Sequence, residues 1–306
     1  MVVEGKFIMN KRKVYLFLVL ANLFWAGNYI FGKLVVAELS PIQMTFCRWL
    51  IAVCLLFPIA QWVEKPAWKA VWKNWPLLLL MGLLGVIGYN LLLYEALRFT
   101  TSLNASLVNA MNPALIVFCA ALFLKERLSK YSVLGLLVSL VGVLLVLTKG
   151  QPGFIFQMAY NAGDLLMLAA ISVWTTYSLL GRRAKGIPPI AAIAVSALLG
   201  LLVVLPFFLA SGNPFPLSGK AVIGIVYIGI FPSVASFIFW NAGIREIGAS
   251  RSSIYMNLIT VFTAILSVLM GNGIEVSQII GGLLVFAGVY LSANNRSFGR
   301  HPRRDS

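Results

Sequence analysis

Apolar stretches of about 20 residues follow one another along almost the whole chain and are separated by short polar turns. A helix needs about 20 apolar residues to cross the hydrocarbon core of a bilayer. The pattern therefore predicts an all-α membrane protein with ten transmembrane helices. The predicted spans are residues 14–34, 41–62, 76–98, 102–124, 131–149, 163–182, 189–210, 221–244, 250–270 and 276–294.

Each half of the chain contains five of these spans, and positions in the first half recur in the second. The matched pairs are Trp25 and Trp174, Gly32 and Gly181, Lys33 and Arg182, and Pro41 and Pro189. Because five is an odd number of crossings, the second copy enters the membrane from the opposite side. Such inverted repeats are typical of secondary transporters, which hold substrate near the midplane between them. We therefore predict a five-helix repeat at 14–149, an inverted five-helix repeat at 163–294, and a basic cytoplasmic tail at 295–306.

Composition agrees with a membrane protein and argues against a bound metal or cofactor. Hydrophobic residues make up 60% of the chain, charged residues 11%, and the mean hydropathy is +0.91. A soluble globular domain does not reach this combination. The cysteines, Cys47, Cys54 and Cys119, fall inside predicted spans without metal-ligand spacing. We therefore expect no metal and no cofactor.

The formal net charge of +15 is explained by where the basic residues lie. With the N-terminus inside, nineteen of the 24 Lys and Arg residues fall in cytoplasmic segments, four in outer loops, and Arg48 in a span. This distribution follows the positive-inside rule. It predicts a multi-pass protein of the cell inner (plasma) membrane with both termini in the cytoplasm. We expect the lipid bilayer, and no nucleic acid, as the partner of the basic charge.

The longest inner connection, residues 64–75, has an amphipathic pattern of its own. Tryptophans recur at helical spacing on one face, at positions 68, 72 and 75, while Lys65, Lys69 and Lys73 recur every four residues. One aromatic face and one cationic face are typical of a helix that lies in the headgroup plane. We expect it to anchor the protein to the membrane surface.

Several short patterns together resemble a known family. They are Trp25-Ala26-Gly27-Asn28-Tyr29 with Lys33, the block from Ala96-Leu97-Arg98 to Leu124-Lys125-Glu126-Arg127-Leu128, Gly163-Asp164-Leu165-Leu166 running to Trp174, and paired glycine helices near 135–147 and 281–291. Over residues 14–294, in both repeats, the chain is similar to the EamA-type transporters of the drug/metabolite transporter superfamily. The resemblance implies ten helices around a central cavity and, commonly, export of amino acids or related metabolites. It does not fix the substrate.

Polar and aromatic residues at helical spacing mark one face of the first span and of the sixth. Asn22, Trp25 and Asn28 (or Tyr29) share a face of the first span, and Trp174 and Tyr177 share the matching face of the sixth. Polar positions inside spans indicate either a cavity or the packing of one helix on another. The tryptophans lie about 11 residues into their spans, too deep for an interfacial aromatic belt. We therefore predict that these faces line the cavity and bind substrate.

Helix-breaking residues occur at corresponding places in the third and eighth spans, at Gly85 and Pro232, and Pro113 interrupts the fourth. Paired interruptions in matching helices point to the binding site of a transporter, although a kink that serves only packing is the alternative. Further candidates for substrate binding lie at similar depth or along the same polar track. They are Asn90, Asn109, Asn112, Trp240, Tyr255 and Asn257.

Two ionisable residues, Arg48 and Glu95, fall inside consecutive spans. At 1.5 Å per residue they lie about 10 Å and about 6 Å below the outer surface, so an ion pair is within reach. A lone arginine in the bilayer is costly and is expected to have a partner. We predict an Arg48–Glu95 pair or gate. The alternatives are a snorkelling Arg48 with Glu95 bonded to Arg98, or an arginine that binds a substrate carboxylate.

The remaining polar residues argue against other mechanisms. No acidic residue lies in the first span or near mid-membrane, so exchange of protons for lipophilic cations at a buried carboxylate is not expected. The spans contain no histidine, no Ser/His set and no phosphate-binding loop, so a membrane enzyme lacks its constellation. We predict no catalytic residues and no enzyme activity.

The sequence thus predicts an inner-membrane secondary transporter that exports amino acids or related small polar metabolites by alternating access. The alternatives are uptake or exchange of a nucleotide-like or sugar-like metabolite, and a polytopic membrane enzyme or a receptor-like binding protein. The expected partners are a small-molecule substrate and the bilayer, with the protein a monomer or a homodimer. The sequence does not identify the solute, the energy source or the direction of transport.

Overall fold

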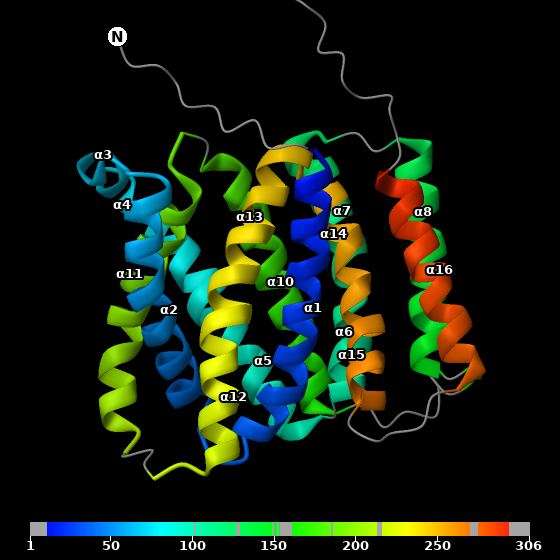
Figure 1. Ribbon diagram of the computed structural model, residues 1–306, viewed down its shortest axis with the longest axis horizontal. Coiled ribbons are helices and arrows are strands. Elements are labelled where there is room, and N and C mark those ends of the chain that lie inside the picture. The colour runs from blue at the N-terminus through cyan, green and yellow to red at the C-terminus, as the bar shows by residue number, and fades with distance from the viewer. Residues whose placement is uncertain are drawn as a thin grey trace, which may run out of the picture.

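The computed structural model describes residues 11–100, 102–126, 129–148, 150–151, 153, 161–184, 186–212, 216–269 and 275–293. This part of the chain folds into helices joined by short turns, and no strand occurs within it. The predicted tail at 295–306 lies outside the described residues. The helices form one bundle in which the N-terminal end of α1 and the C-terminal end of α16 lie at the same end (Figure 1).

The first half contains five consecutive helical segments and one short surface helix. They are α1 (Lys11–Val35), α2 (Pro41–Val63), the short α3 (Trp68–Trp72), the continuous series α4 (Trp75–Met81), η1 (Gly82–Gly88) and α5 (Tyr89–Phe99), then α6 (Ser102–Asn109) with α7 (Asn112–Leu124), and α8 (Lys130–Thr148). A capping box starts α2: the Ser40 hydroxyl accepts from Gln43 N–H, and the Gln43 side chain accepts from Ser40 N–H.

The second half repeats this order. It contains α10 (Ala162–Arg183), α11 (Pro189–Ala210), the continuous series α12 (Gly219–Ile230), η2 (Phe231–Ala235) and α13 (Ser236–Ile247), then α14 (Ala249–Ile254), η3 (Tyr255–Asn257) and α15 (Leu258–Leu269), and α16 (Val276–Ala293). Asn161 and Asp164 form the capping box that starts α10. The prolines that open α2 and α11 suit the first helical turn, where no backbone donor is needed.

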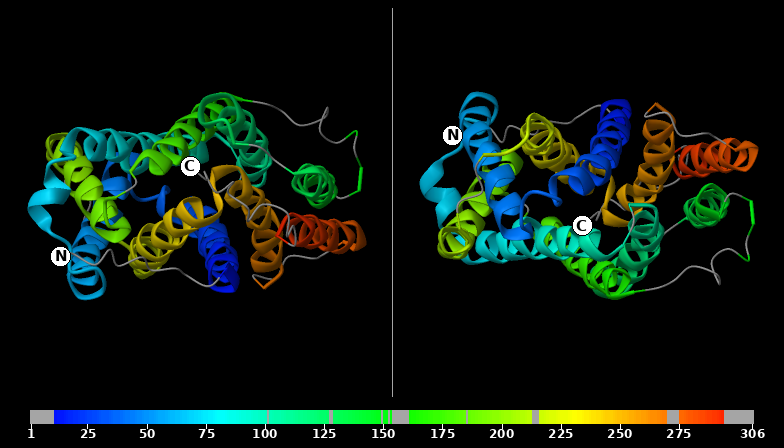
Figure 2. Two further views of the ribbon diagram at one scale, coloured as in Figure 1. Left: turned by 90° about the horizontal axis from the view of Figure 1, so that it is seen from above. Right: turned by 90° about the horizontal axis from the view of Figure 1, so that it is seen from below.

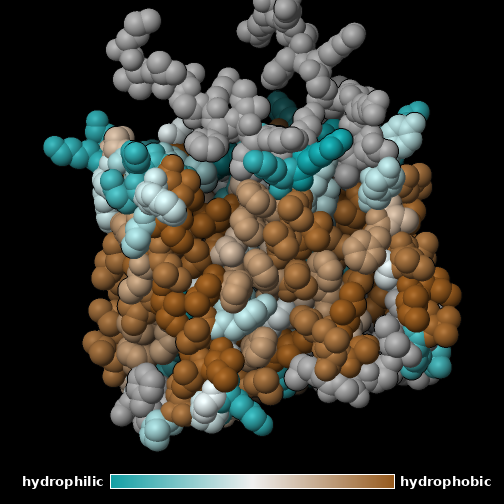
Figure 3. Space-filling model, viewed as in Figure 1, coloured by the Kyte–Doolittle hydropathy of each residue, from teal (hydrophilic) through white to brown (hydrophobic). Residues whose placement is uncertain are grey.

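Six of the predicted spans form helices long and apolar enough to cross a membrane. They are Arg12–Val35, Pro41–Val63, Trp75–Phe99, Ala162–Arg183, Pro189–Ala210 and Gly219–Ile247. The fourth, fifth, ninth and tenth predicted spans correspond to shorter or interrupted apolar helices. On the face shown in Figure 3, hydrophobic side chains cover the middle of the molecule and hydrophilic ones gather at its two ends. The chain is therefore an integral membrane protein.

The first helices of the two halves run in opposite directions. At the C-terminal end of α1, the Lys33 ammonium donates to the backbone oxygens of Leu97 and Thr100 at the end of α5. The Thr100 hydroxyl in turn donates to Asp164 at the start of α10, at 3.0 Å. The end of α1 and the start of α10 therefore lie at one end of the bundle.

Helices α8 and α16 pack along each other at one edge of the bundle (Figures 1 and 2). Two glycine pairs allow this approach, because a Cβ on Gly135 would lie 2.4 Å from the Gly288 oxygen and one on Gly142 would lie 2.5 Å from the Gly281 oxygen. Small residues at such positions let helix backbones come close together in membranes.

Candidate functional site

A narrow cavity at the centre of the bundle is lined by residues of both halves. The lining consists of Trp25, Asn28, Tyr29, Arg48, Tyr89 and Asn90 from the first half and Trp174, Phe237, Met256 and Ile259 from the second. It has space for about one water molecule. The predicted candidates Trp25, Asn28, Arg48, Asn90 and Trp174 therefore share one site.

Aromatic rings close this cavity from opposite sides. Trp25 and Trp174 meet edge to face, with ring centroids 5.2 Å apart, and Phe237 lies edge-on to both at 6.2 and 5.5 Å. Tyr89 lies 5.0 Å from Trp174. Edge-to-face pairs are favourable beyond the apolar area that they bury. The matched tryptophans of the two halves thus make one aromatic wall.

Trp240 and Tyr177, both predicted to bind substrate, pack against the rings of this wall in a second layer. Trp240 lies 5.6 Å from Trp25 and 5.9 Å from Trp174, and Tyr177 lies 5.1 Å from Trp174. The Tyr177 hydroxyl accepts from Asn241 at 2.9 Å. These two residues hold the lining rings in place and do not themselves line the cavity.

The breaks predicted at Gly85 and Pro232 take the form of π-helical turns, η1 and η2. Such turns leave backbone carbonyls without their usual partners, and they are frequent at functional sites. Asn90 donates to the Gly85 and Val86 oxygens at 3.0 and 2.9 Å, and the Trp25 indole donates to the Pro232 oxygen at 3.2 Å. Both turns therefore fix residues of the cavity. The third predicted break, at Pro113, lies in the first turn of α7 and separates that helix from α6.

Arg48 is the charged residue of the cavity, and its side chain is buried with 1% exposure. Its Nε donates to the Ser233 hydroxyl at 2.8 Å. Its Nη1 donates to the Asn90 amide oxygen at 2.6 Å, to the Asn28 amide oxygen at 3.5 Å, and to the Tyr94 hydroxyl. All four acceptors are neutral. Within the described residues, no carboxylate lies within ion-pair distance of Arg48.

The predicted Arg48–Glu95 pair is wrong. Glu95 instead forms an ion pair with Arg98, one turn further along α5, at 3.1 Å near the surface. Successive residues of a helix point about 100° apart, and the residues of α5 that bond to Arg48 are Asn90 and Tyr94. The depths predicted for Arg48 and Glu95 would allow an ion pair, but the directions of their side chains do not.

Besides Tyr177 and Trp240, five of the predicted binding residues lie outside the cavity lining. They are Asn22, Asn109, Asn112, Tyr255 and Asn257. Three of them join helices or cap carbonyls: Asn22 donates to the Leu18 oxygen of its own helix, Asn112 accepts from Thr175, and Asn257 donates to Ser139 of α8. The ring of Tyr255 stacks on that of Tyr15. These contacts agree with the alternative interpretation, the packing of one helix on another.

The sequence did not point to four lining residues, Tyr89, Phe237, Met256 and Ile259. Tyr89 follows the glycine series of η1 directly, which is a usable signal. The other three are apolar residues in apolar helices, where composition does not distinguish a cavity from a lipid-facing surface.

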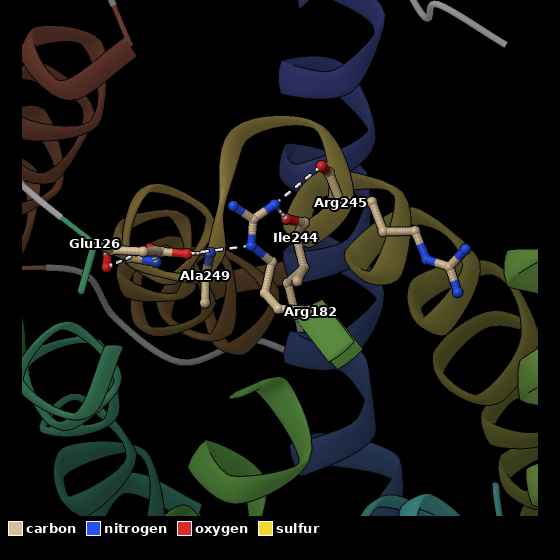
Figure 4. A network of polar contacts seen from close by, with 6 residues as sticks. Glu126, Arg182, Ile244, Arg245 and Ala249 are labelled. Atoms are coloured by element: carbon tan, nitrogen blue, oxygen red, sulfur yellow. Dashed lines mark hydrogen bonds and ion pairs between the residues drawn. The ribbon is translucent and has the colours of Figure 1, made fainter. Parts of the chain in front are cut away.

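A polar network ties the two halves together at the end of the bundle where α13 meets α14 (Figure 4). Glu126, which follows α7, forms an ion pair with Arg182 of α10 at 3.2 Å. The same carboxylate accepts from the backbone N–H groups of Ala249 and Ser250 at the start of α14. Arg182 also donates to the Ile244 and Arg245 oxygens near the end of α13, both at 3.2 Å. A carboxylate at a helix N-terminus satisfies free donors and the helix dipole.

Glu64 makes an equivalent contact at the start of α11. Its two carboxylate oxygens accept from the backbone N–H groups of Ile190 and Ala191, both at 2.8 Å. Burial raises the pKa of Glu64 despite these hydrogen bonds and the nearby positive charge of Arg245. Two acidic residues of the first half therefore cap two helices of the second.

Comparison with known proteins identifies the family. The model of the EamA-like transporter family matches residues 12–148 and again residues 161–294. The chain belongs to this family. It is 30% identical to the uncharacterized transporter YyaM of Bacillus subtilis (strain 168), over 92% of this chain and 93% of that protein.

A second relative carries a named activity. The aromatic amino acid exporter YddG of Ancylobacter novellus is 28% identical over 64% of this chain and 66% of its own length. The fold is also similar to that of a solved crystal structure, with a TM-score of 0.75 and 21% identity, covering 92% of this chain and 97% of the other. The chain is therefore a membrane transporter of the EamA type.

Proposed function

We propose that this transporter exports amino acids with aromatic side chains across the inner membrane by alternating access. In this proposal all ten apolar segments cross the bilayer as two inverted five-helix repeats, 14–149 and 163–294, and both termini lie in the cytoplasm. The repeated family match, the opposite directions of α1 and α10, and the positive-inside distribution of Lys and Arg support this arrangement.

One observation carries the choice of substrate: the central cavity is walled by Trp25, Tyr89, Trp174 and Phe237, contributed by both halves. Flat aromatic side chains bind well between such rings because they bury apolar area and pair edge to face. A nucleotide, which carries several negative charges, would need more cationic groups than Arg48, the cationic residue of this lining, supplies. The name of the exporter relative agrees with the choice.

The cavity has space for about one water molecule, so in this proposal the solute enters it only when the halves move apart. Contacts between the halves hold them together at both ends of the bundle. At the end of the bundle assigned to the cytoplasm, Glu126 and Glu64 cap helices of the second half. At the other end, the Gln43 amide donates to the Ser211 and Gly212 oxygens, and Glu38 accepts from Ser218. In the proposed cycle, loading from the cytoplasm requires the first set to open while the second stays closed, and release requires the reverse.

Counterflow in proteoliposomes tests the proposal. Liposomes that hold purified protein and unlabelled L-phenylalanine should accumulate labelled L-phenylalanine, and unlabelled L-tryptophan should compete. Neither an enzyme nor a receptor gives counterflow. If labelled L-phenylalanine and L-tryptophan fail to accumulate while the protein is folded and inserted, the proposed substrate class is wrong.

A further inference from the structure

We propose that Arg48 binds the carboxylate of the transported solute, so that the site selects monocarboxylates carrying one aromatic ring. This inference rests on the proposed function, because it takes the central cavity to be where the solute binds. It deepens that function by assigning the recognised group and the residue that recognises it.

The positive charge of Arg48 lies among neutral groups. The guanidinium is buried, and each of its hydrogen-bond acceptors, Ser233, Asn28, Asn90 and Tyr94, is neutral. Within the described residues no carboxylate balances it. A charge inside the membrane is costly, and charges that persist there are usually paired or face a pathway. An anionic solute supplies the missing partner.

One side of the Arg48 guanidinium is free to bind a ligand. Nε and Nη1 are occupied by the four neutral acceptors, whereas Nη2 has no hydrogen-bond partner among the described residues. Arg48 lines the cavity. The N–H groups of Nη2 are therefore the donors through which the arginine can meet a ligand there.

The acceptors of Arg48 hold its guanidinium in a fixed orientation. The Asn90 amide nitrogen donates to the Gly85 and Val86 oxygens of η1, which turns its oxygen toward Nη1. The Ser233 hydroxyl donates to the Ile228 oxygen at 2.7 Å, which leaves its lone pairs for Nε. Each π-helical turn thus supports one anchor of Arg48. A preorganised donor binds an anion with less loss of entropy than a mobile one.

The lining also indicates the charge and the chemical class of the ligand. Arg48 is the cationic residue of the lining, so the lining balances one negative charge. The rest is largely aromatic, with Trp25, Trp174 and Phe237 in mutual contact. One charge beside an aromatic wall fits a monocarboxylate with one ring, and does not fit a phosphate ester or a dicarboxylate.

Two probes of matched shape test the inference on the unaltered protein. They are 3-phenylpropionate, which carries a carboxylate, and 3-phenylpropanamide, which is neutral. We expect the acid to raise the melting temperature of the protein in detergent. The amide should bind about 10- to 100-fold more weakly, which is the factor in affinity that a hydrogen bond to a charged group usually contributes. Equal affinities, or no binding of the acid, would overturn the inference.

Variants of Arg48 then test whether this residue causes the preference for the acid. In Arg48→Gln the preference for the acid should disappear, and in Arg48→Lys, which keeps the charge but loses the fork of donors, it should be reduced. Arg98→Gln is the matched control, because this arginine pairs with Glu95 near the surface, and it should keep the full preference. A preference that survives in Arg48→Gln contradicts the assignment. If that variant does not fold, the acid and amide affinities of Arg48→Lys and of the unaltered protein decide.

Counterflow separates this inference from the proposed function. If labelled L-phenylalanine accumulates and the acid and the amide inhibit it equally, the transport function holds and the carboxylate site is wrong. If the acid binds in preference to the amide but no aromatic amino acid undergoes counterflow, the carboxylate site holds and the proposed function is wrong.

Discussion

Trp25 of α1 and Trp174 of α10 stand edge to face across the centre of the bundle, with their ring planes at 88°. They occupy matched positions of the two repeats, on helices that run in opposite directions. The same residue type at the same place in each copy therefore builds the two sides of one site.

Replacing either tryptophan should impair transport. We expect Trp25→Ala and Trp174→Ala each to lower counterflow of L-phenylalanine by about tenfold or more, because each loses both a ring contact and apolar wall. Counterflow per inserted protein is the measurement. Trp62→Ala is the control, since Trp62 is 82% exposed at the end of α2, and it should transport normally. Normal counterflow in both cavity variants would mean that the wall is only packing.

Removing the carboxylate of Glu95 should change little. We expect Glu95→Gln to shift stability by about 1 kcal/mol or less, because its ion pair with Arg98 is near the surface. In a double-mutant cycle, the losses of Glu95→Gln and Arg48→Gln should add, since the two side chains share no contact. Thermal melting of the three variants measures this. A clear recovery of stability in the double variant would restore the ion pair that the sequence suggested.

Glu126 should matter through the helix that it caps. Glu126→Ala removes the ion pair with Arg182 and the hydrogen bonds to the start of α14, and we expect a loss of about 0.5–2 kcal/mol. Glu126→Gln keeps an acceptor and should lose less. Glu246→Ala, at an exposed position of α13, is the control for charge alone. Melting curves that are equal for all three variants would argue against a capping role.

The glycine contact between α8 and α16 predicts a steric effect. In Gly135→Ala the added Cβ would meet the Gly288 oxygen at 2.4 Å, so the helices must move apart, at a cost of about 1–3 kcal/mol. Gly219→Ala is matched in size, and its Cβ would meet no atom within 4 Å. Thermal melting should therefore distinguish the two alanine variants. Equal melting temperatures would show that the helix pair tolerates separation.

The predicted topology can be checked with reporters. Nineteen basic residues in the segments predicted to be inner, against four in those predicted to be outer, predict a cytoplasmic C-terminus. A fluorescent reporter fused there should be active, and a reporter that works only in the periplasm should be inactive. The reverse result would contradict either the even number of spans or the cytoplasmic N-terminus.

The sequence was informative where one physical quantity decides the structure. The length of an apolar stretch determines whether it can span the bilayer, and glycine and proline are the residues that most often interrupt an α-helix, as Gly85 and Pro232 do. The depth of Arg48 also follows from helix rise. The hydrogen-bond partners of Arg48 could not be predicted in this way, because the depth of a residue does not determine the direction in which its side chain points from the helix. Whether Tyr94 or Glu95 faces Arg48 depends on how α2 and α5 are rotated.

The candidate site shows the same limit. Trp25 and Trp174 stood out because they recur in both repeats, whereas Phe237 and Met256 are apolar residues among many others. Asn257 lies at a suitable depth but turns to Ser139 of α8. Polarity inside a span therefore identified residues that need a partner, without showing whether the partner is a helix or a solute.

Arg48 joins the two halves of the chain through different nitrogens of one rigid group. Nη1 is bonded to Asn28, Asn90 and Tyr94 of the first half, and Nε to Ser233 of the second. A displacement of one half against the other must change at least one of these hydrogen bonds. It must therefore alter the orientation or the bonding of the guanidinium that faces the cavity. Thermodynamic linkage then works in both directions: an anion held by Arg48 biases the arrangement of the halves by the same factor by which that arrangement changes its affinity.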